Sequence, residues 1–309
     1  MSAPIRATRV TIVEVGPRDG LQNESVHLDA ATRVAFIDAL SAAGLPVIET
    51  AAFVSPRWVP QMAGAAEVVK GIKQRPGVRY TALVPNLHGL GDALDAGVRE
   101  VAIFAAASET FSFRNINSDV ARSLATYAEV VRRAHEGGAR VRAYLSTAFG
   151  CPYEGPVPVA RVVEIAGRLA ELGVFQIAIS DTIGVAHPGH VWELLGALTP
   201  HIAVEALALH FHDTRGTALA NVLAGLQAGV STFDSSAGGL GGCPFAPGAT
   251  GNLATEDLVY MLEGLGIETG VDLDSVVAAS RLIESKLGHA LPSRYLQALR
   301  GTTRRDRQS

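Results

Sequence analysis

Two histidines, His210 and His212, are separated by a single residue in this sequence. They follow an apolar run, residues 204–209, that is typical of a β-strand, and alternate residues of a strand point to the same face of a sheet. Both imidazoles should therefore face the same side, where they could hold a divalent cation. Asp19 and Asn252 could supply oxygen ligands if the fold brings their segments to this strand.

Further side chains could work beside such a cation. Arg18 directly precedes Asp19, and Cys243 follows the glycine-rich segment 238–242. This segment lacks the Lys-Ser/Thr ending of a phosphate-binding loop, so its glycines predict close backbone approach and a hinged closure that carries Cys243 onto a bound substrate. For the second cysteine, Cys151, packing in the core and lining a pocket are both open.

Composition limits the class of protein. The 309 residues are 48% hydrophobic, which is enough for a large core, and a net charge of -4 provides no basic stripe for nucleic acid. Two cysteines cannot form a disulfide framework, and no apolar run approaches the roughly 18 residues of a membrane span. Residues 1–9 lack the apolar core of a secretory signal, so we expect a cytoplasmic enzyme without a membrane partner.

Apolar, often β-branched runs alternate eight times with segments of helical spacing. The expected strands cover residues 10–15, 47–51, 79–84, 100–105, 140–145, 175–180, 204–212 and 230–235. The expected helices cover residues 28–43, 63–73, 89–96, 120–136, 159–172, 191–198, 218–228 and 256–265. This rhythm predicts an α/β fold, a (β/α)₈ TIM barrel over residues 1–271, with a C-terminal helical extension, 272–309, whose tail from 301 is polar. An open doubly wound sheet is the alternative, although no Gly-x-Gly-x-x-Gly follows a strand.

In such a barrel the polar residues gather on one rim. Arg18 and Asp19 follow the first strand, Glu49 lies in the second and Asp181 ends the sixth. The histidine pair ends the seventh strand, and Cys243 and Asn252 follow the eighth. Any one of these residues could be a helix cap or turn residue, but barrel active sites lie at the carboxyl ends of the strands. Their joint position predicts an active site there.

Several segments resemble the 3-hydroxy-3-methylglutaryl-CoA lyase family. They are VEVGPRDGLQNE (13–24), FVSPRWVPQM (53–62), GCPYEG (150–155), SDTIG (180–184), GGLGGCP (238–244) and GNLATED (251–257). The resemblance implies that Asp19, His210, His212 and Asn252 bind the divalent cation. It also implies that Arg18 contacts the thioester oxygen and that Cys243 is the mobile catalytic thiol. Glu49 and Asp181 match pocket acids, while Gln22 and Asn115 match positions beside the acyl-CoA substrate.

The implied reaction cleaves 3-hydroxy-3-methylglutaryl-CoA to acetyl-CoA and acetoacetate, as in leucine breakdown and ketone body formation. A cation with open coordination positions helps the substrate hydroxyl lose its proton, Arg18 meets the enolate oxygen, and Cys243 can protonate the enolate carbon. Mixed oxygen and imidazole ligands suit Mg²⁺ or Mn²⁺, although Co²⁺ or Zn²⁺ would bind tightly. The base is left unassigned among a metal-bound water, Asp19 and the histidines. The resemblance also implies a homodimer or a larger assembly.

Two departures from the family pattern concern the acyl-CoA end. Ser25 stands where lysine is usual, and the segment before Asn115, TFSFR (110–114), has an aromatic residue where a basic one is common. A lyase for citramalyl-CoA or for a longer-branched 3-hydroxyglutaryl-CoA is therefore an alternative substrate assignment. A Claisen-type synthase that joins acetyl-CoA to a 2-oxo acid is a further alternative, against which the loop at 241–244 argues. A barrel without catalytic activity would require a broken site, and every expected ligand is present.

Overall fold

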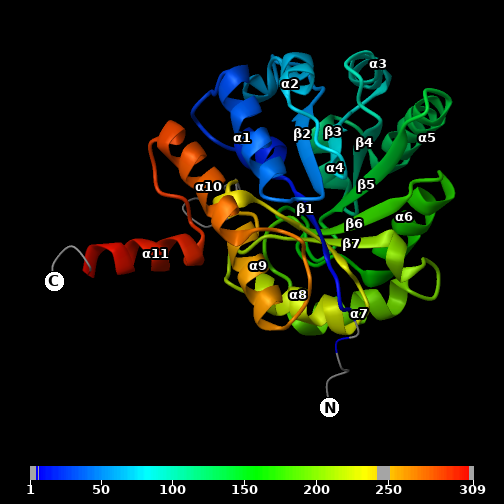
Figure 1. Ribbon diagram of the computed structural model, residues 1–309. Helices are drawn as coiled ribbons and strands as arrows, with labels where there is room; N and C mark the ends of the chain where they lie inside the picture. The colour runs from blue at the N-terminus through cyan, green and yellow to red at the C-terminus, as the bar shows by residue number, and fades with distance from the viewer. Residues whose placement is uncertain (1–4, 6, 242–250, 306–309) are drawn as a thin grey trace.

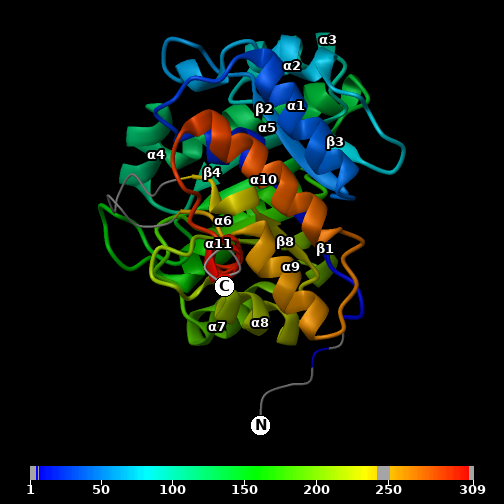
Figure 2. The same ribbon diagram turned by 60° about the vertical axis from the view of Figure 1, so that its left-hand side comes forward.

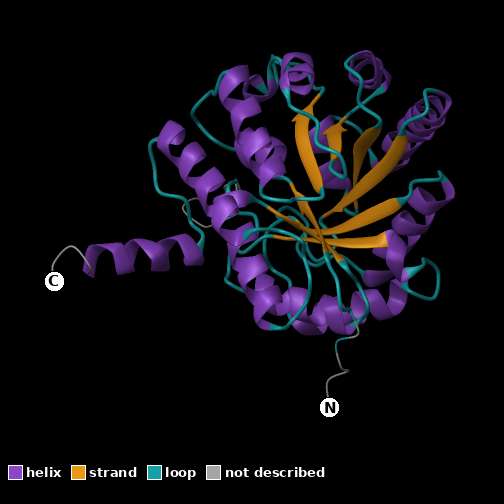
Figure 3. Ribbon diagram, in the orientation of Figure 1, coloured by secondary structure: helices purple, strands orange, loops and turns teal. Residues whose placement is uncertain are grey.

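The computed structural model describes residue 5, residues 7–241 and residues 251–305. Eight parallel strands form a closed barrel in chain order, because β1 pairs with both β2 and β8. Helices surround the strands on the outside (Figure 3). The strands are β1 (Thr11–Glu14), β2 (Val47–Ala52), β3 (Arg79–Leu83), β4 (Glu100–Ala106), β5 (Arg140–Ser146), β6 (Gln176–Asp181), β7 (Leu207–Phe211) and β8 (Thr232–Ser235). The predicted (β/α)₈ barrel is confirmed, and closure excludes the open doubly wound sheet.

The helices that follow the strands match the predicted segments in order. They are α1 (Ala30–Ala42), α2 (Ala65–Gly71), α3 (Leu87–Asp95), α5 (Val120–Glu136), α6 (Val159–Glu171), α7 (Pro188–Leu198), α8 (Ala218–Gln227) and α9 (Thr255–Gly264). Helix α5 illustrates why the sequence pattern predicted these helices. Asp119 caps its first turn by accepting a hydrogen bond from the amide of Arg122. Leu124, Tyr127 and Val131 recur on one face and are buried against the barrel.

Three local features differ from the prediction. Helix α4 (Glu109–Ile116), in the β4–α5 connection, was not predicted, because it buries only Phe111 and Ser112 and carries no continuous apolar stripe. A short 3₁₀ helix, η2 (Pro60–Met62), precedes α2, which is shorter than expected. The start of the seventh expected strand was wrong: Val204–Ala206 forms the 3₁₀ helix η3, and β7 begins at Leu207.

The C-terminal extension forms two helices. Helix α10 (Leu273–Leu287) starts at the cap Asp272, contacts α1 and α9, and ends at Gly288 in the left-handed conformation. Helix α11 (Arg294–Arg305) projects away from the barrel and continues into the segment expected as a polar tail (Figures 1 and 2). Its start is held by the carboxylate of Asp257, which accepts from Ser293 Oγ and from the amide of Tyr295. Throughout the described part of the chain, no helix is long and apolar enough to cross a membrane.

Candidate active site

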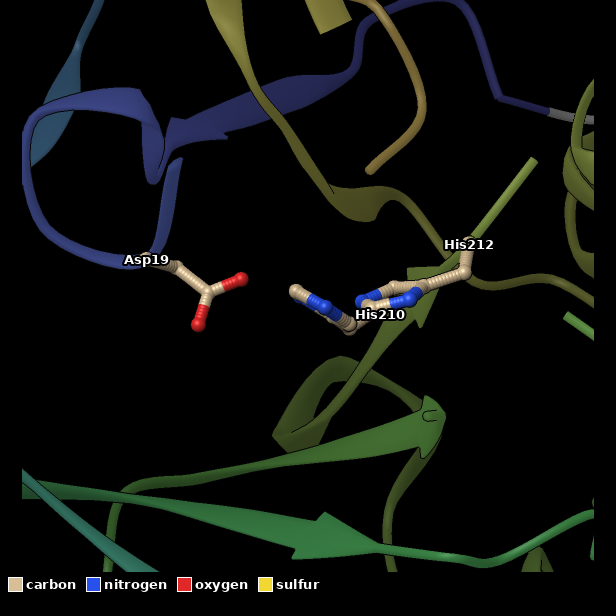
Figure 4. Close-up of side chains that lie close together, drawn as sticks. All are labelled: Asp19, His210 and His212. Atoms are coloured by element: carbon tan, nitrogen blue, oxygen red, sulfur yellow. The ribbon is translucent and has the colours of Figure 1, made fainter. Parts of the chain in front are cut away.

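The turn that follows β1 carries Arg18 and Asp19. It is a single π-helical turn, η1 (Gly16–Gly20), in which the amide of Asp19 donates to the carbonyl of Val15 at 2.8 Å. The turn directs the carboxylate of Asp19 toward the imidazoles of His210 and His212 (Figure 4). One ligand atom from each of these three side chains lies within 4.8 Å of the other two. The structure therefore brings together three residues that the sequence predicted as metal ligands.

The two histidines share one side of β7, as their spacing predicts. His210 lies within β7 and His212 directly follows its last residue, with ring centroids 5.3 Å apart and both side chains buried. Phe211, between them, packs against Phe149 at 5.9 Å between ring centroids. Because successive side chains of a strand point to opposite faces, Phe211 lies on the other face from the two histidines.

Asn252 reaches the cluster through backbone pairing with His212. Its amide nitrogen donates to Asp19 Oδ2 at 2.9 Å and to the carbonyl of Leu240 at 3.1 Å. Because both amide hydrogens are engaged in this way, the side-chain oxygen is the atom of Asn252 that can bind a cation. Asn252, the fourth predicted ligand, therefore contacts Asp19 directly.

The protonation states of these groups fit a divalent cation. Burial, reinforced by His210, lowers the pKa of His212 to about 4, so its imidazole is neutral at pH 7 and keeps a lone pair for a metal. Nδ1 of His212 is buried and has no hydrogen-bond partner among the described residues. Burial alone would raise the pKa of Asp19, but the charge of Arg18 outweighs it with help from both histidines, and the pKa falls to about 2. Two imidazoles, a carboxylate and an amide oxygen form a suitable ligand set.

Arg18 is fixed between two carboxylates beside this cluster. Its Nε donates to Glu49 Oε2 at 2.5 Å, and its Nη1 donates to Asp19 Oδ1 at 2.7 Å. The guanidinium also lies 5.4 Å from the ring centroid of Tyr144. These contacts hold a permanent positive charge in a buried position next to the predicted metal ligands, where a developing negative charge could be stabilised.

Glu49 supports Arg18 from the neighbouring strand. The carboxylate is fully buried, and its Oε2 also accepts from the hydroxyl of Tyr144 at 3.2 Å. Burial raises the pKa of Glu49, although the charge of Arg18 acts in the opposite direction. Its Oε1 is buried without a hydrogen-bond partner among the described residues. Glu49 is therefore a carboxylate with one oxygen engaged by Arg18 and the other available.

Sequence reasoning missed the pair that supports His210. Asp234 Oδ2, on β8, lies 3.2 Å from His210 Nδ1, and Arg142 Nη2, on β5, donates to Asp234 Oδ1 at 2.6 Å. A carboxylate on one imidazole nitrogen fixes the ring and leaves the other nitrogen as the metal ligand. The signal was present in the sequence, because a charged residue inside an apolar strand must find a partner when it is buried.

Asp181 is placed differently from the other predicted acids. It is fully buried, and its two oxygens accept from the amides of Val185 at 3.0 Å and of Ala186 at 2.9 Å. Burial raises the pKa of Asp181, and these two amides act against that shift. The geometry gives Asp181 a role in holding the β6–α7 connection, and its role as a catalytic acid stays a prediction.

The remaining predicted site residues lie around the rim or outside the described part. Gln22 is half-buried just after η1, Asn115 is exposed on α4, and Cys243 lies outside the described residues. Cys151 satisfies both interpretations given to it. It packs with Phe111 in a small buried cluster, and it lines a pocket of about 570 Å³ between the β5–α6 and β6–α7 connections.

Comparison with known proteins identifies the family. The HMGL-like family model matches residues 9–283. The chain is 52% identical over 291 residues to the 3-hydroxy-3-isohexenylglutaryl-CoA/hydroxy-methylglutaryl-CoA lyase of Pseudomonas aeruginosa, covering 94% of this chain and 97% of that protein. It is 52% identical to the mitochondrial hydroxymethylglutaryl-CoA lyase of Bos taurus, covering 94% and 89%.

Solved structures agree with this assignment. The crystal structure of the HMG-CoA lyase of Bacillus subtilis matches with a TM-score of 0.94 and 48% identity, covering 97% of this chain and 100% of that one. The hydroxymethylglutaryl-CoA lyase of Pseudomonas aeruginosa matches with a TM-score of 0.94 and 50% identity, covering 98% and 100%. The sequence motifs, the barrel and the clustered ligands lead to one conclusion: this chain belongs to the HMGL-like family of lyases.

Proposed function

We propose that this protein is a carbon–carbon lyase that cleaves 3-hydroxy-3-methylglutaryl-CoA to acetyl-CoA and acetoacetate with the help of a divalent cation. The observation that carries the proposal is the position of Arg18. Its guanidinium is held between Asp19 and Glu49, directly beside the cluster of Asp19, His210 and His212. A retro-Claisen cleavage needs a site that activates a hydroxyl next to a group that stabilises an enolate oxygen, and this arrangement supplies both.

Each group has a definable task in that reaction. Asp19, His210, His212 and Asn252 would hold the cation, which polarises substrate oxygens and makes the hydroxyl proton easier to remove. Arg18 keeps its charge throughout and faces the thioester oxygen as negative charge develops there. Because the two carboxylates already fix the guanidinium, it does not have to reorganise during the reaction.

The buried acids and histidines of the site support one proposal for the proton acceptor. Asp19, with a pKa of about 2, and His212, with a pKa of about 4, are weak bases. Glu49 has a raised pKa and a buried oxygen without a partner among the described residues. We assign the exchange of the hydroxyl proton to Glu49, and we retain Cys243 as the donor to the enolate carbon on the strength of the sequence motif alone.

The donor set also supports a choice of metal. The carboxylate of Asp19 and the amide oxygen of Asn252 are hard oxygen ligands, which suit Mg²⁺ or Mn²⁺. We propose one of these two ions as the physiological cofactor. Isothermal titration of the metal-free protein with each ion, and with Zn²⁺ and Co²⁺ for comparison, would rank them.

A second substrate deserves a parallel test because of one relative. The Pseudomonas aeruginosa protein, which is 52% identical, carries a name that covers both 3-hydroxy-3-isohexenylglutaryl-CoA and hydroxymethylglutaryl-CoA. Near the expected acyl-CoA end, this chain has Ser25 in place of the usual lysine and an exposed Phe113 on α4. A longer-branched 3-hydroxyglutaryl-CoA is therefore the second candidate substrate.

The decisive experiment measures acetoacetate release from 3-hydroxy-3-methylglutaryl-CoA. The protein is stripped with chelator under reducing conditions and resupplied with Mg²⁺ or Mn²⁺, with His212→Ala as the matched control. Metal-dependent release with kcat/KM of about 10⁴–10⁸ M⁻¹s⁻¹ is expected. Tight metal binding with negligible release would reject this substrate and direct the assay to the longer-branched and citramalyl thioesters. Consumption of acetyl-CoA with a 2-oxo acid would instead identify a synthase.

Three broader predictions accompany this function. We propose a homodimer or larger assembly, which light scattering of the purified protein would test. We also propose that residues 1–271 form the catalytic barrel and that 272–309 form a C-terminal helical extension with a polar tail, and the contacts of its first helix, α10, with α1 and α9 support this division. The cytoplasmic location stays a prediction from the sequence, whereas the Bos taurus relative is named as mitochondrial.

A further inference from the structure

Glu14, at the end of β1, is a fully buried carboxylate that the chemistry above does not use. Its Oε1 accepts hydrogen bonds from two backbone amides, those of Gly16 and Ala237, each at 2.8 Å. Its Oε2 accepts from the hydroxyl of Thr255 at 2.6 Å. One side chain therefore bonds to the turn next to it and to two segments more than two hundred residues further along the chain. Glu14 and Thr255, for example, are separated by 241 positions.

Each of these three segments carries a component of the candidate site. Gly16 begins η1, which presents Arg18 and Asp19. Ala237 begins the 3₁₀ turn η4 (Ala237–Gly239), and the next carbonyl, that of Leu240, accepts from the side chain of Asn252. Thr255 lies three residues after Asn252 and begins α9. Glu14 therefore bonds both to the turn that carries Asp19 and to the segments that hold Asn252, and these two residues are proposed metal ligands.

Close packing at the junction leaves little freedom for these segments. A Cβ atom at Gly16 would lie 2.6 Å from Glu14 Oε1, so the backbone of η1 sits directly on the carboxylate. A Cβ atom at Gly20 would lie 2.8 Å from Leu240 Cβ and 2.9 Å from Ser236 Oγ. The η1 turn and the 236–240 turn are therefore in direct contact, and a displacement of either would move the other.

The burial of a carboxylate here is costly for the fold. Burial raises the pKa of Glu14 to about 7 even though three hydrogen bonds act in the opposite direction. A hydrophobic residue at this position would avoid that cost, but it could not accept from two amides and a hydroxyl. The three donors would then be left buried without a partner, so the carboxylate is required by what surrounds it.

We propose that Glu14 is a positioning residue that holds η1, the 236–240 turn and the Asn252 segment in one frame, and so sets the geometry of the metal site without touching the cation. The inference rests on the proposed function only through the predicted metal site. It predicts that Glu14 determines the affinity for a metal and the order of three separated segments, both of which can be measured without substrate.

The test compares Glu14→Ala with Glu100→Ala. Glu100 is also a buried acid on the barrel, but it begins β4 at the opposite rim and pairs with Arg79 at 2.9 Å. Mn²⁺ binding is measured by titration calorimetry, and hydrogen exchange is followed in metal-free protein. We expect Glu14→Ala to weaken Mn²⁺ binding about 10- to 100-fold, the range typical of residues that orient metal ligands. Exchange should accelerate in residues 16–20, 237–241 and 252–255, whereas Glu100→Ala should change neither.

Wild-type Mn²⁺ affinity and exchange in a folded Glu14→Ala variant would overturn the proposal. If that variant does not fold, Thr255→Val replaces it, because valine is close to threonine in shape and removes the hydroxyl that donates to Glu14 Oε2. This variant should accelerate exchange mainly in 252–255 and weaken Mn²⁺ binding several-fold, and unchanged values would again overturn the proposal. Wild-type protein that is inactive on the substrate would reject the proposed function while leaving this comparison valid.

Discussion

Replacement of Arg18 by lysine separates charge from geometry at the candidate site. The arginine uses two different nitrogens, Nε toward Glu49 at 2.5 Å and Nη1 toward Asp19 at 2.7 Å. A lysine ammonium keeps the positive charge, but it is a compact group on a flexible stem and lacks the planar fork that meets both carboxylates. Arg18→Lys should therefore retain one of the two contacts and lose the fixed orientation.

The size of the effect follows from the lost contact. A hydrogen bond to a charged group contributes about 1.5–3 kcal/mol, and each 1.4 kcal/mol corresponds to about a factor of ten in rate. Loss of one such contact predicts a fall in kcat of about 10- to 150-fold. Loss of a donor to an enolate-type oxygen typically costs about 10²–10³. We expect a fall of about 100-fold in kcat, with Mn²⁺ affinity within about threefold of wild type because Arg18 is not a proposed metal ligand.

The assay is steady-state acetoacetate release at saturating Mn²⁺, combined with calorimetric titration of Mn²⁺. Arg132→Lys, on the exposed face of α5 where arginine pairs with Glu129 and Glu136, controls for a general effect of the substitution. A kcat within threefold of wild type in Arg18→Lys would show that the fixed guanidinium is not needed for turnover. A loss of metal binding in the same variant would show that Arg18 acts on the ligands rather than on the substrate.

Three further predictions test the ligands and the buried acids. His212→Ala should abolish both metal binding and turnover, and metal binding at wild-type strength would remove His212 from the site. Asp234→Asn should weaken Mn²⁺ binding about 10- to 100-fold, because the imidazole of His210 would lose the carboxylate that orients it; unchanged calorimetry would contradict this. Burial raises the pKa of Glu256 from 4.5 to about 8, so the folded state binds its proton more tightly than the unfolded state does. Its contribution to the free energy of unfolding is therefore present below about pH 4.5 and is lost as the pH rises to about 8. Glu256→Gln should flatten the fall in thermal midpoint between those pH values, and parallel curves for wild type and variant would disprove the assignment.

The local pattern of apolar residues in the sequence was sufficient to predict the barrel architecture. Alternating apolar strands and amphipathic helices are read over windows of a few residues, and the eight repeats predicted the closed barrel that the structure has. The placement of His210 and His212 on one side of β7 also needed nothing beyond the strand period. Helix α4 was not predicted because it is short and largely exposed. Its start is marked by a cap at Ser108, but it has no apolar stripe that would reveal a helical period. Sequence therefore determined the elements wherever burial imposed a period.

Only the tertiary structure decided which distant groups meet. The contact of Asn252 with Asp19 spans 233 positions, and the junction at Glu14 spans up to 241, so both depend on barrel closure between β1 and β8. Packing between strands also set the partners of buried charges, joining Arg18 to Glu49 and Arg142 to Asp234. A sequence states which side chains carry charge, but the energy of a buried charge depends on its neighbours in space, and these are fixed only when strand register and loop packing are complete.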